Sequence, residues 1–207
     1  MKKLILASQS PRRKMLLEQI GVPFKVFQSD ADETINENIG PKEYAAVLSE
    51  RKAEDVTGKL SGEELNSSVV LAADTIVVLG HHILGKPQMA QEAFQTLLML
   101  SGKWHEVMTG VTLLDAETGR KMTHVEKTRV KIRSMDHKAI WRYIDSGEPF
   151  DKAGGYGIQG LGALLVEKLE GCYYNVVGLP LYSVSIMLGQ MGIETLLINS
   201  SLSYTKE

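Results

Sequence analysis

The stretch Leu4–Lys14, LILASQSPRRK, joins an apolar run to the beginning of a helix. Leu4–Ala7 predicts a buried strand, and the residues after it predict a helix over Pro11–Ile20. Ser10 stands where an N-cap belongs, and Pro11 suits the first helical position because its missing N–H would have no partner there. The chain is therefore expected to open with a strand that leads directly into a helix.

The beginning of this predicted helix suits an anion. Its first N–H groups have no partner inside the helix, and they lie at the positive end of the helix dipole. Arg12 and Arg13 add forked donors at the same place, and phosphate is the natural ligand for this combination. A surface helix with two solvated arginines is the alternative, and this segment alone leaves both open.

Outward from this segment, periodicity and turn residues predict alternating strands and helices. Strands are expected at residues 24–26, 69–79, 106–114, 122–132, 161–166 and 195–198, and the turn at 117–119 makes the third and fourth of them a hairpin. Helices are expected at 41–59, 90–100, 137–144 (capped by Asp136) and 179–191. Residues 29–39 are predicted as a loop, 62–68 as a polar linker and 200–207 as a frayed tail. The predicted class is α/β, a mixed twisted sheet with flanking helices.

Composition narrows the function classes. The chain has 207 residues, 43% hydrophobic, which excludes global disorder, and a net charge of −2, which argues against coating nucleic acid. Cys172 is the single cysteine, which excludes an intramolecular disulfide and suits a reducing cytosol. No apolar run approaches the roughly 20 residues that span a bilayer, and the stretch after Met1 is too short for a signal peptide. A cytoplasmic protein without membrane or nucleic-acid partners is predicted.

Asp74 is the clearest anomaly in the sequence. It lies inside VVLAADTIVV, where nearly every neighbour is apolar or small. A buried carboxylate is unfavourable unless it is paired or binds a cation, and such groups also mark active sites. Asp74 is therefore either tied to a nearby Arg or backbone N–H, or it performs chemistry.

Other candidate residues have weaker signals. Glu33 lies in an acidic stretch that could supply Mg²⁺ with oxygen ligands or could be a solvated loop. Lys52 lies beside an apolar helical stripe, and Lys86 lies in a rigid Gly-Lys-Pro turn, so each is a phosphate ligand or an ordinary surface lysine. The glycine-rich segment 151–162 contains Gln159, whose amide can pair with the donor and acceptor edge of uracil or thymine. A plain flexible loop is the alternative there.

Four separated motifs resemble the Maf family of nucleoside triphosphate pyrophosphatases. They are LASQSPRRK, Ala73-Asp74-Thr75, Gly85-Lys86-Pro87 and DKAGGYGIQG from Asp151 to Gly160, and they occur in the order of the family's pattern. The resemblance implies one domain over residues 1–207 with an elongated inosine-triphosphatase-like fold, two lobes around a central cleft, and a homodimer.

The resemblance also implies roles for individual residues. Asp74 would be the general base and, with Glu33, a ligand of Mg²⁺ or Mn²⁺. The phosphates would be bound by Ser8, Arg13, Lys52 and Lys86. Arg12, Thr75 and Gln159 form the family's pyrimidine-type specificity set.

The implied activity is hydrolysis of dTTP or UTP, and of modified pyrimidine nucleotides, to the monophosphate and pyrophosphate. One alternative is a nucleotide-binding regulator of cell division without turnover, since the family is also named for inhibition of septum formation. A phosphotransferase is a second alternative, but it needs an acceptor site that the sequence does not suggest.

Overall fold

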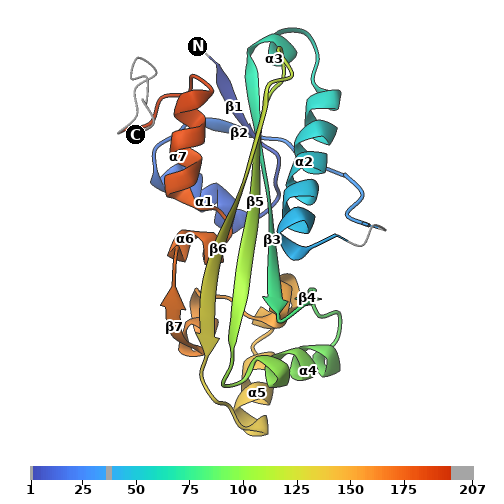
Figure 1. Cartoon of the computed structure of the whole chain (residues 1–207), viewed down its shortest axis with the longest axis vertical. Coiled ribbons are helices and arrows are strands. Elements are labelled where there is room, and N and C mark those ends of the chain that lie inside the picture. The colour runs from blue at the N-terminus through green and yellow to red at the C-terminus, as the bar shows by residue number, and fades with distance from the viewer. Residues whose placement is uncertain (1, 36–38, 197–207) are drawn as a thin grey trace.

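The computed structural model describes residues 2–35 and 39–196, an elongated molecule built along three long strands (Figure 1). These strands are β3 (Ser68–Leu79), β5 (Trp104–Asp115) and β6 (Lys121–Ile132). Within the described residues they belong to a seven-stranded sheet of order β2-β1-β3-β5-β6-β7, with β4 paired to β3. Only the pairs of β1 with β2 and with β3 are parallel, so the sheet is mixed, as predicted. The shorter strands are β1 (Lys3–Leu6), β2 (Phe24–Val26), β4 (His82–Leu84) and β7 (Val166–Glu170).

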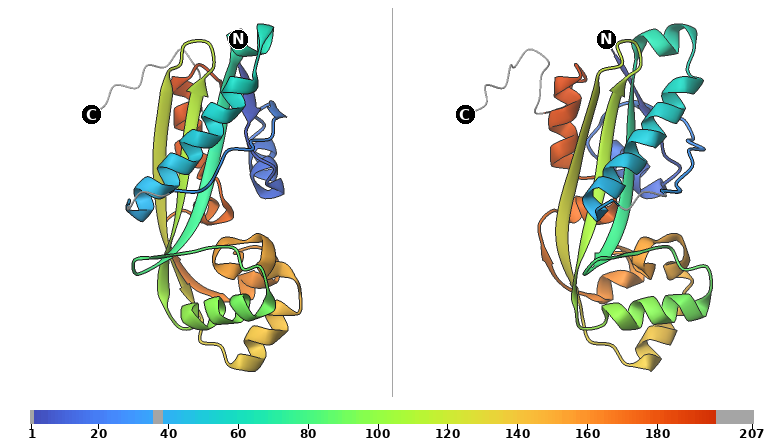
Figure 2. Two further views of the ribbon diagram at one scale, coloured as in Figure 1. Left: turned by 90° about the vertical axis from the view of Figure 1, so that its right-hand side faces the viewer. Right: turned by 45° about the vertical axis from the view of Figure 1, so that its right-hand side comes forward.

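Helices cover the sheet at both ends of the molecule. At one end, α2 (Pro41–Lys59) crosses one face, while α1 (Pro11–Gln19) and α7 (Leu181–Gln190) lie on the other (Figure 2). At the opposite end, α4 (Ala90–Leu100) and α5 (His137–Ile144) pack together (Figure 1). Asp136 caps α5, as predicted, because its carboxylate accepts the N–H of Ala139 at 2.7 Å.

The alternation of side chains along β1 and β3 produces two separate apolar layers. Val70 and Ala72 join a buried cluster with Ala53 and Val56 of α2. Their neighbours in the strand face the opposite way, toward a cluster with α1 and α7. Its members from β1 and β3 are Leu4, Leu6, Val69, Leu71 and Ala73. Successive residues of a strand point to opposite faces, so a run that is apolar throughout is buried on both sides.

Helix α2 lies against the sheet without an intervening side chain at Gly110 of β5. A Cβ atom at position 110 would lie 2.1 Å from the carbonyl oxygen of Ala45 in α2. Glycine is required because no other residue permits this backbone approach. The contact fixes the distance of α2, which carries Lys52, from the sheet.

Three sequence predictions of secondary structure were wrong. The predicted linker 62–68 contains helix α3 (Gly62–Ser67), whose Glu63 and Glu64 pair with Lys3 of β1 and Lys25 of β2 at 2.6 and 2.7 Å. The predicted strand 161–166 is the 3-10 turn η3 (Gly160–Leu164) followed by β7. The predicted strand 195–198 is reduced to a bridge at Thr195 and a turn at Leu196, and its last two residues lie outside the described part.

The remaining predicted helices and strands agree with the structure to within two residues. Residues 36–38 of the predicted loop 29–39 and the predicted tail 200–207 lie outside the described residues. Four short elements of the described residues had no prediction: β4, α6 (Tyr173–Val177) and the 3-10 turns η1 (Glu148–Asp151) and η2 (Ala153–Gly155). Within the described residues, no helix combines the length and the apolar character needed to cross a membrane.

Candidate active site

A cleft of about 830 Å³ is bounded by segments that lie far apart in the sequence. Its walls come from the start of α1, the loop before α2, α2 itself, the middle of β3, the turn after β4 and the glycine-rich segment. Every residue that the sequence nominated lines this cleft: Ser8, Arg12, Arg13, Glu33, Lys52, Asp74, Thr75, Lys86 and Gln159.

The alternation of β3 places Asp74 and Thr75 on opposite faces of the sheet. Asp74 follows Val70 and Ala72 on the face covered by α2, where its Oδ1 accepts a hydrogen bond from Lys52 Nζ at 2.5 Å. Thr75 faces α1, and its Oγ1 accepts from Arg13 Nη2 at 3.2 Å. One strand therefore contributes adjacent residues to two walls of the cleft.

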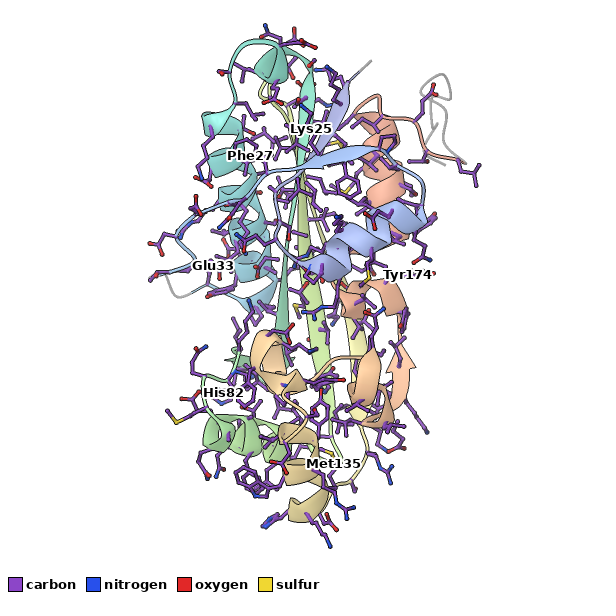
Figure 3. The ribbon with its side chains drawn as sticks, turned by 180° about the vertical axis from the view of Figure 1, so that it is seen from behind. Lys25, Phe27, Glu33, His82, Met135 and Tyr174 are labelled. Atoms are coloured by element: carbon purple, nitrogen blue, oxygen red, sulfur yellow. The ribbon has the colours of Figure 1, made fainter. Side chains whose placement is uncertain are left out.

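Lys52 joins two carboxylates from different segments. Its Nζ lies 2.5 Å from Asp74 Oδ1 and 2.7 Å from Glu33 Oε1, and the side chains of Lys52 and Asp74 are only 14% and 13% exposed. Glu33 extends from the loop beside α2 (Figure 3). Partial burial raises the pKa of Glu33, but Lys52, Lys86 and Arg13 outweigh it, so this pKa lies below its ordinary value. Asp74 is thus paired, with a lysine rather than the Arg or backbone N–H considered from the sequence.

Arg13 is held by neutral oxygen atoms. It donates from Nε to the carbonyl of Gly178 at 2.9 Å, from Nη1 to Ser8 Oγ at 3.2 Å and from Nη2 to Thr75 Oγ1. Burial lowers the pKa of Arg13, and the negative charge of Asp74 opposes this shift. Because none of the three acceptors carries a charge, the positive charge of Arg13 is not neutralised by these contacts.

The beginning of α1 differs in one detail from the sequence prediction. Ser10 occupies the N-cap position of α1, but its side chain makes no capping hydrogen bond. Its backbone N–H instead donates to Ser8 Oγ at 3.2 Å. Ser8 is thereby fixed between this N–H and the guanidinium of Arg13, at the wall of the cleft.

The side chain of Arg12 extends across the cleft to Asp151 and does not lie beside that of Arg13. Its Nη1 lies 3.0 Å from Asp151 Oδ2, at the end of the 3-10 turn η1 (Glu148–Asp151). Lys152 Nζ lies 2.6 Å from the other oxygen of Asp151. Burial raises the pKa of Asp151, but the hydrogen bonds from Lys152 and Arg12 hold it below its ordinary value.

Lys86 and Gln159 are exposed at the edge of the cleft. In the part of the chain that the structure describes, neither side chain forms a hydrogen bond or an ion pair with the protein. Their polar groups are therefore available to a ligand in the cleft.

The sequence of this chain matches a known family. Residues 3–191 of this chain match the model of the Maf-like protein family. This chain belongs to the Maf-like family. Curated Maf-like relatives include a dTTP/UTP pyrophosphatase of Caldicellulosiruptor bescii, 48% identical over 94% of this chain and 97% of the relative. The protein of the same name from Halalkalibacterium halodurans is 54% identical over 87% of this chain and 92% of the relative. Among solved structures, the Staphylococcus aureus Ham1 protein matches 78% of each chain with 14% identity and a TM-score of 0.43.

Sequence reasoning missed several residues that line the cleft of this Maf-like chain, and a buried one, Asn175, that does not line it. Glu148 and the carbonyl of Gly178 had no recognisable signal, because Leu161 and Arg13, which they accept from, lie 13 and 165 positions away. Asp151 begins the motif DKAGGYGIQG, but no role was predicted for it. Asn175 is fully buried and donates to the carbonyl of Val107 at 3.0 Å. An asparagine inside the mostly apolar run YYNVVGL was a signal that could have found it.

Proposed function

We propose that this chain hydrolyses dTTP and UTP, and modified pyrimidine nucleoside triphosphates, between the α and β phosphates. The products are the nucleoside monophosphate and pyrophosphate. The observation that carries the proposal is the convergence of Lys52, Glu33 and Asp74 in one cleft with Arg13, whose hydrogen-bond acceptors are all neutral. The names of the relatives described above support the choice of substrate.

The triphosphate is bound by cations from three segments. Arg13 and Ser8 come from the start of α1, Lys52 from α2 and Lys86 from the turn after β4. A nucleoside triphosphate carries three or four negative charges, so several separate cations are required to offset them. Fixed donors around the β and γ phosphates stabilise the charge that develops on the leaving pyrophosphate.

Asp74 is the proposed general base. Lys52 binds its Oδ1, and no donor among the described residues hydrogen-bonds its Oδ2. Oδ2 is therefore able to accept the proton of a water molecule that attacks the α phosphate. Lys52 orients the carboxylate next to the substrate through the hydrogen bond to its Oδ1.

The residues of the cleft fit a divalent metal such as Mg²⁺ or Mn²⁺. Glu33 and Asp74 both approach one cationic nitrogen within 2.7 Å, so their oxygens converge on a position for positive charge. Two carboxylates completed by phosphate oxygens and waters are an ordinary ligand set for Mg²⁺. Among the described residues, no group of three or more acidic, His or Cys side chains is placed to hold a metal ion. When bound, the metal would neutralise phosphate charge and polarise the water.

Arg12, Thr75 and Gln159 are proposed to select the base. The amide of Gln159 offers one donor and one acceptor to the edge of uracil or thymine. Thr75 acts through its hydrogen bond with Arg13, and Arg12 is held across the cleft by its ion pair with Asp151. A purine would leave the amide of Gln159 unpaired, at about 1–3 kcal/mol once the bound base shields it from water.

The experiment is a nucleotide panel with separate detection of pyrophosphate and orthophosphate. We expect pyrophosphate as the first product, with kcat/KM for dTTP and UTP above that for ATP and GTP. Early orthophosphate with a nucleoside diphosphate would contradict α–β cleavage. Tight nucleotide binding without any product, in the presence of Mg²⁺ or Mn²⁺, would instead favour the regulator without turnover.

A further inference from the structure

Glu148 lies at the wall of the cleft and binds the backbone that follows Gln159. Its Oε1 accepts the N–H of Leu161 at 2.7 Å, and its Oε2 accepts the N–H of Gly162 at 3.1 Å. The hydroxyl of Tyr143, from α5, donates to Oε2 at 3.2 Å. One carboxylate thereby holds the first turn of η3, whose N-cap residue is Gln159.

The backbone at Gly160 is shaped around this carboxylate. Gly160 has a φ of +67°, and a Cβ there would lie 2.6 Å from Glu148 Oε1. Glycine is needed both for the left-handed conformation and for the close approach. Because Gly160 directly follows Gln159, the direction in which Gln159 leaves the backbone depends on the position of Glu148.

The start of the segment Gly157–Gly162 is also held by contacts to η1 and to Lys152, which follows η1. Lys152 Nζ donates to the backbone carbonyl of Glu148 at 2.7 Å. The side chain of Lys152 lies under Gly157, where a Cβ would be 2.9 Å from its Cε. The segment from Gly157 to Gly162 is therefore supported at both ends, and Gln159 lies between the supports.

We propose that Glu148 is a positioning residue for base selection, which acts by fixing the place of Gln159 in the cleft. This inference rests on the proposed function, because it requires that Gln159 contacts the base. Burial raises the pKa of Glu148, but the two N–H groups and Tyr143 hold it below its ordinary value, so the carboxylate is the form that binds the turn. Glu148 forms no hydrogen bond or ion pair with Lys52, Asp74 or Arg13, so we expect its substitution to leave the phosphate-binding residues in place.

The test is Glu148→Gln, combined with Gln159→Ala in a double-mutant cycle. The glutamine amide replaces one acceptor oxygen by a donor that faces a backbone N–H, so one charge-assisted hydrogen bond is lost. We expect the ratio of kcat/KM for dTTP to that for GTP to fall about 10-fold, mainly through KM for dTTP, with kcat within about 3-fold. In the Gln159→Ala background, Glu148→Gln should change this ratio by less than about 2-fold, because both substitutions remove the same function, base selection by Gln159.

The controls separate this inference from the proposed function and from a general loss of structure. Glu167→Gln is the matched control, because Glu167 pairs with Lys131 at 2.8 Å on the surface and should leave the ratio unchanged. Tyr143→Phe removes only the hydroxyl donor to Glu148 and should shift the ratio in the same direction by a smaller factor. A parent protein without preference for dTTP refutes base reading itself, and with it this inference. A parent preference that Gln159→Ala abolishes but Glu148→Gln preserves overturns the inference alone, as does an additive double mutant.

Discussion

Asp74→Asn is the most direct perturbation of the proposed chemistry. The substitution is nearly isosteric. It keeps an oxygen that can accept a hydrogen bond from Lys52 Nζ, which lies 2.5 Å from Asp74 Oδ1 in the parent protein. It removes the negative charge that would take a proton from water. Loss of a general base reduces turnover by about 10²–10⁴-fold, which corresponds to a barrier increase of about 3–5 kcal/mol.

The same substitution should affect the fold much less. Lys52 keeps its ion pair with Glu33 at 2.7 Å, so the ammonium is not left without a carboxylate. Converting one charge-assisted hydrogen bond into a neutral one lowers the free energy of unfolding by about 1–2 kcal/mol. For a chain of this size that is a decrease in Tm of about 2–8 °C. The predicted effect on turnover therefore exceeds the predicted effect on stability.

The assay is the initial rate of pyrophosphate release at saturating dTTP, with a thermal melt of each variant. Glu63→Gln is the control, because it removes an exposed carboxylate that pairs with Lys3 at 2.6 Å, far from the cleft. We expect this control to retain the parent rate. A folded Asp74→Asn protein with a near-normal rate would refute the assignment of the general base.

Three further perturbations test the fold, a buried imidazole and the contact across the cleft. Gly110→Ala should lower the free energy of unfolding by about 3 kcal/mol or more, measured by urea denaturation, because the new Cβ would lie 2.1 Å from the backbone oxygen of Ala45. Burial lowers the pKa of His105 from 6.5 to about 4, so the unfolded chain takes up a proton before the folded protein does. The free energy of unfolding should therefore fall by about 2 kcal/mol between pH 7 and pH 5, and His105→Asn should remove this part of the slope; an unchanged slope contradicts the assignment. Asp151→Asn should weaken the hold on Arg12 and raise KM for dTTP by about 3–10-fold, and an unaltered KM would show that the contact does not order the cleft.

The sequence predicted the elements whose signals are local. The run Leu4–Lys14 contains its own strand, cap position and helix start, and the structure has β1 and α1 there. The apolar run VVLAADTIVV likewise predicted a carboxylate inside a buried strand at Asp74, whose side chain is 13% exposed. The nine nominated residues do line one cleft, but their individual roles stay predictions.

The parts that the sequence did not predict depend on partners far away in the chain. Arg12 and Asp151 are separated by 139 positions, and neither position carries a pattern that names the other. Glu148 binds backbone N–H groups, which every residue except proline possesses, so no residue type marks its partner. The segment after Gln159 has the composition of a strand, but the carboxylate and the left-handed Gly160 turn it into a 3-10 helix.

The three long strands also have a mechanical consequence. β3, β5 and β6 each have 12 residues and pass from the helices at one end of the molecule to those at the other (Figure 1). Asp74 pairs with Gly110, and Gly110 with Val125, at the level of the cleft, so the hydrogen-bonded ladder is continuous there. Widening the cleft would bend this ladder elastically instead of turning two bodies about a flexible joint. Substrate entry and product release would then be governed by side chains such as Arg12 that span the opening, while the amide protons of central β5 exchange slowly whether or not nucleotide is bound.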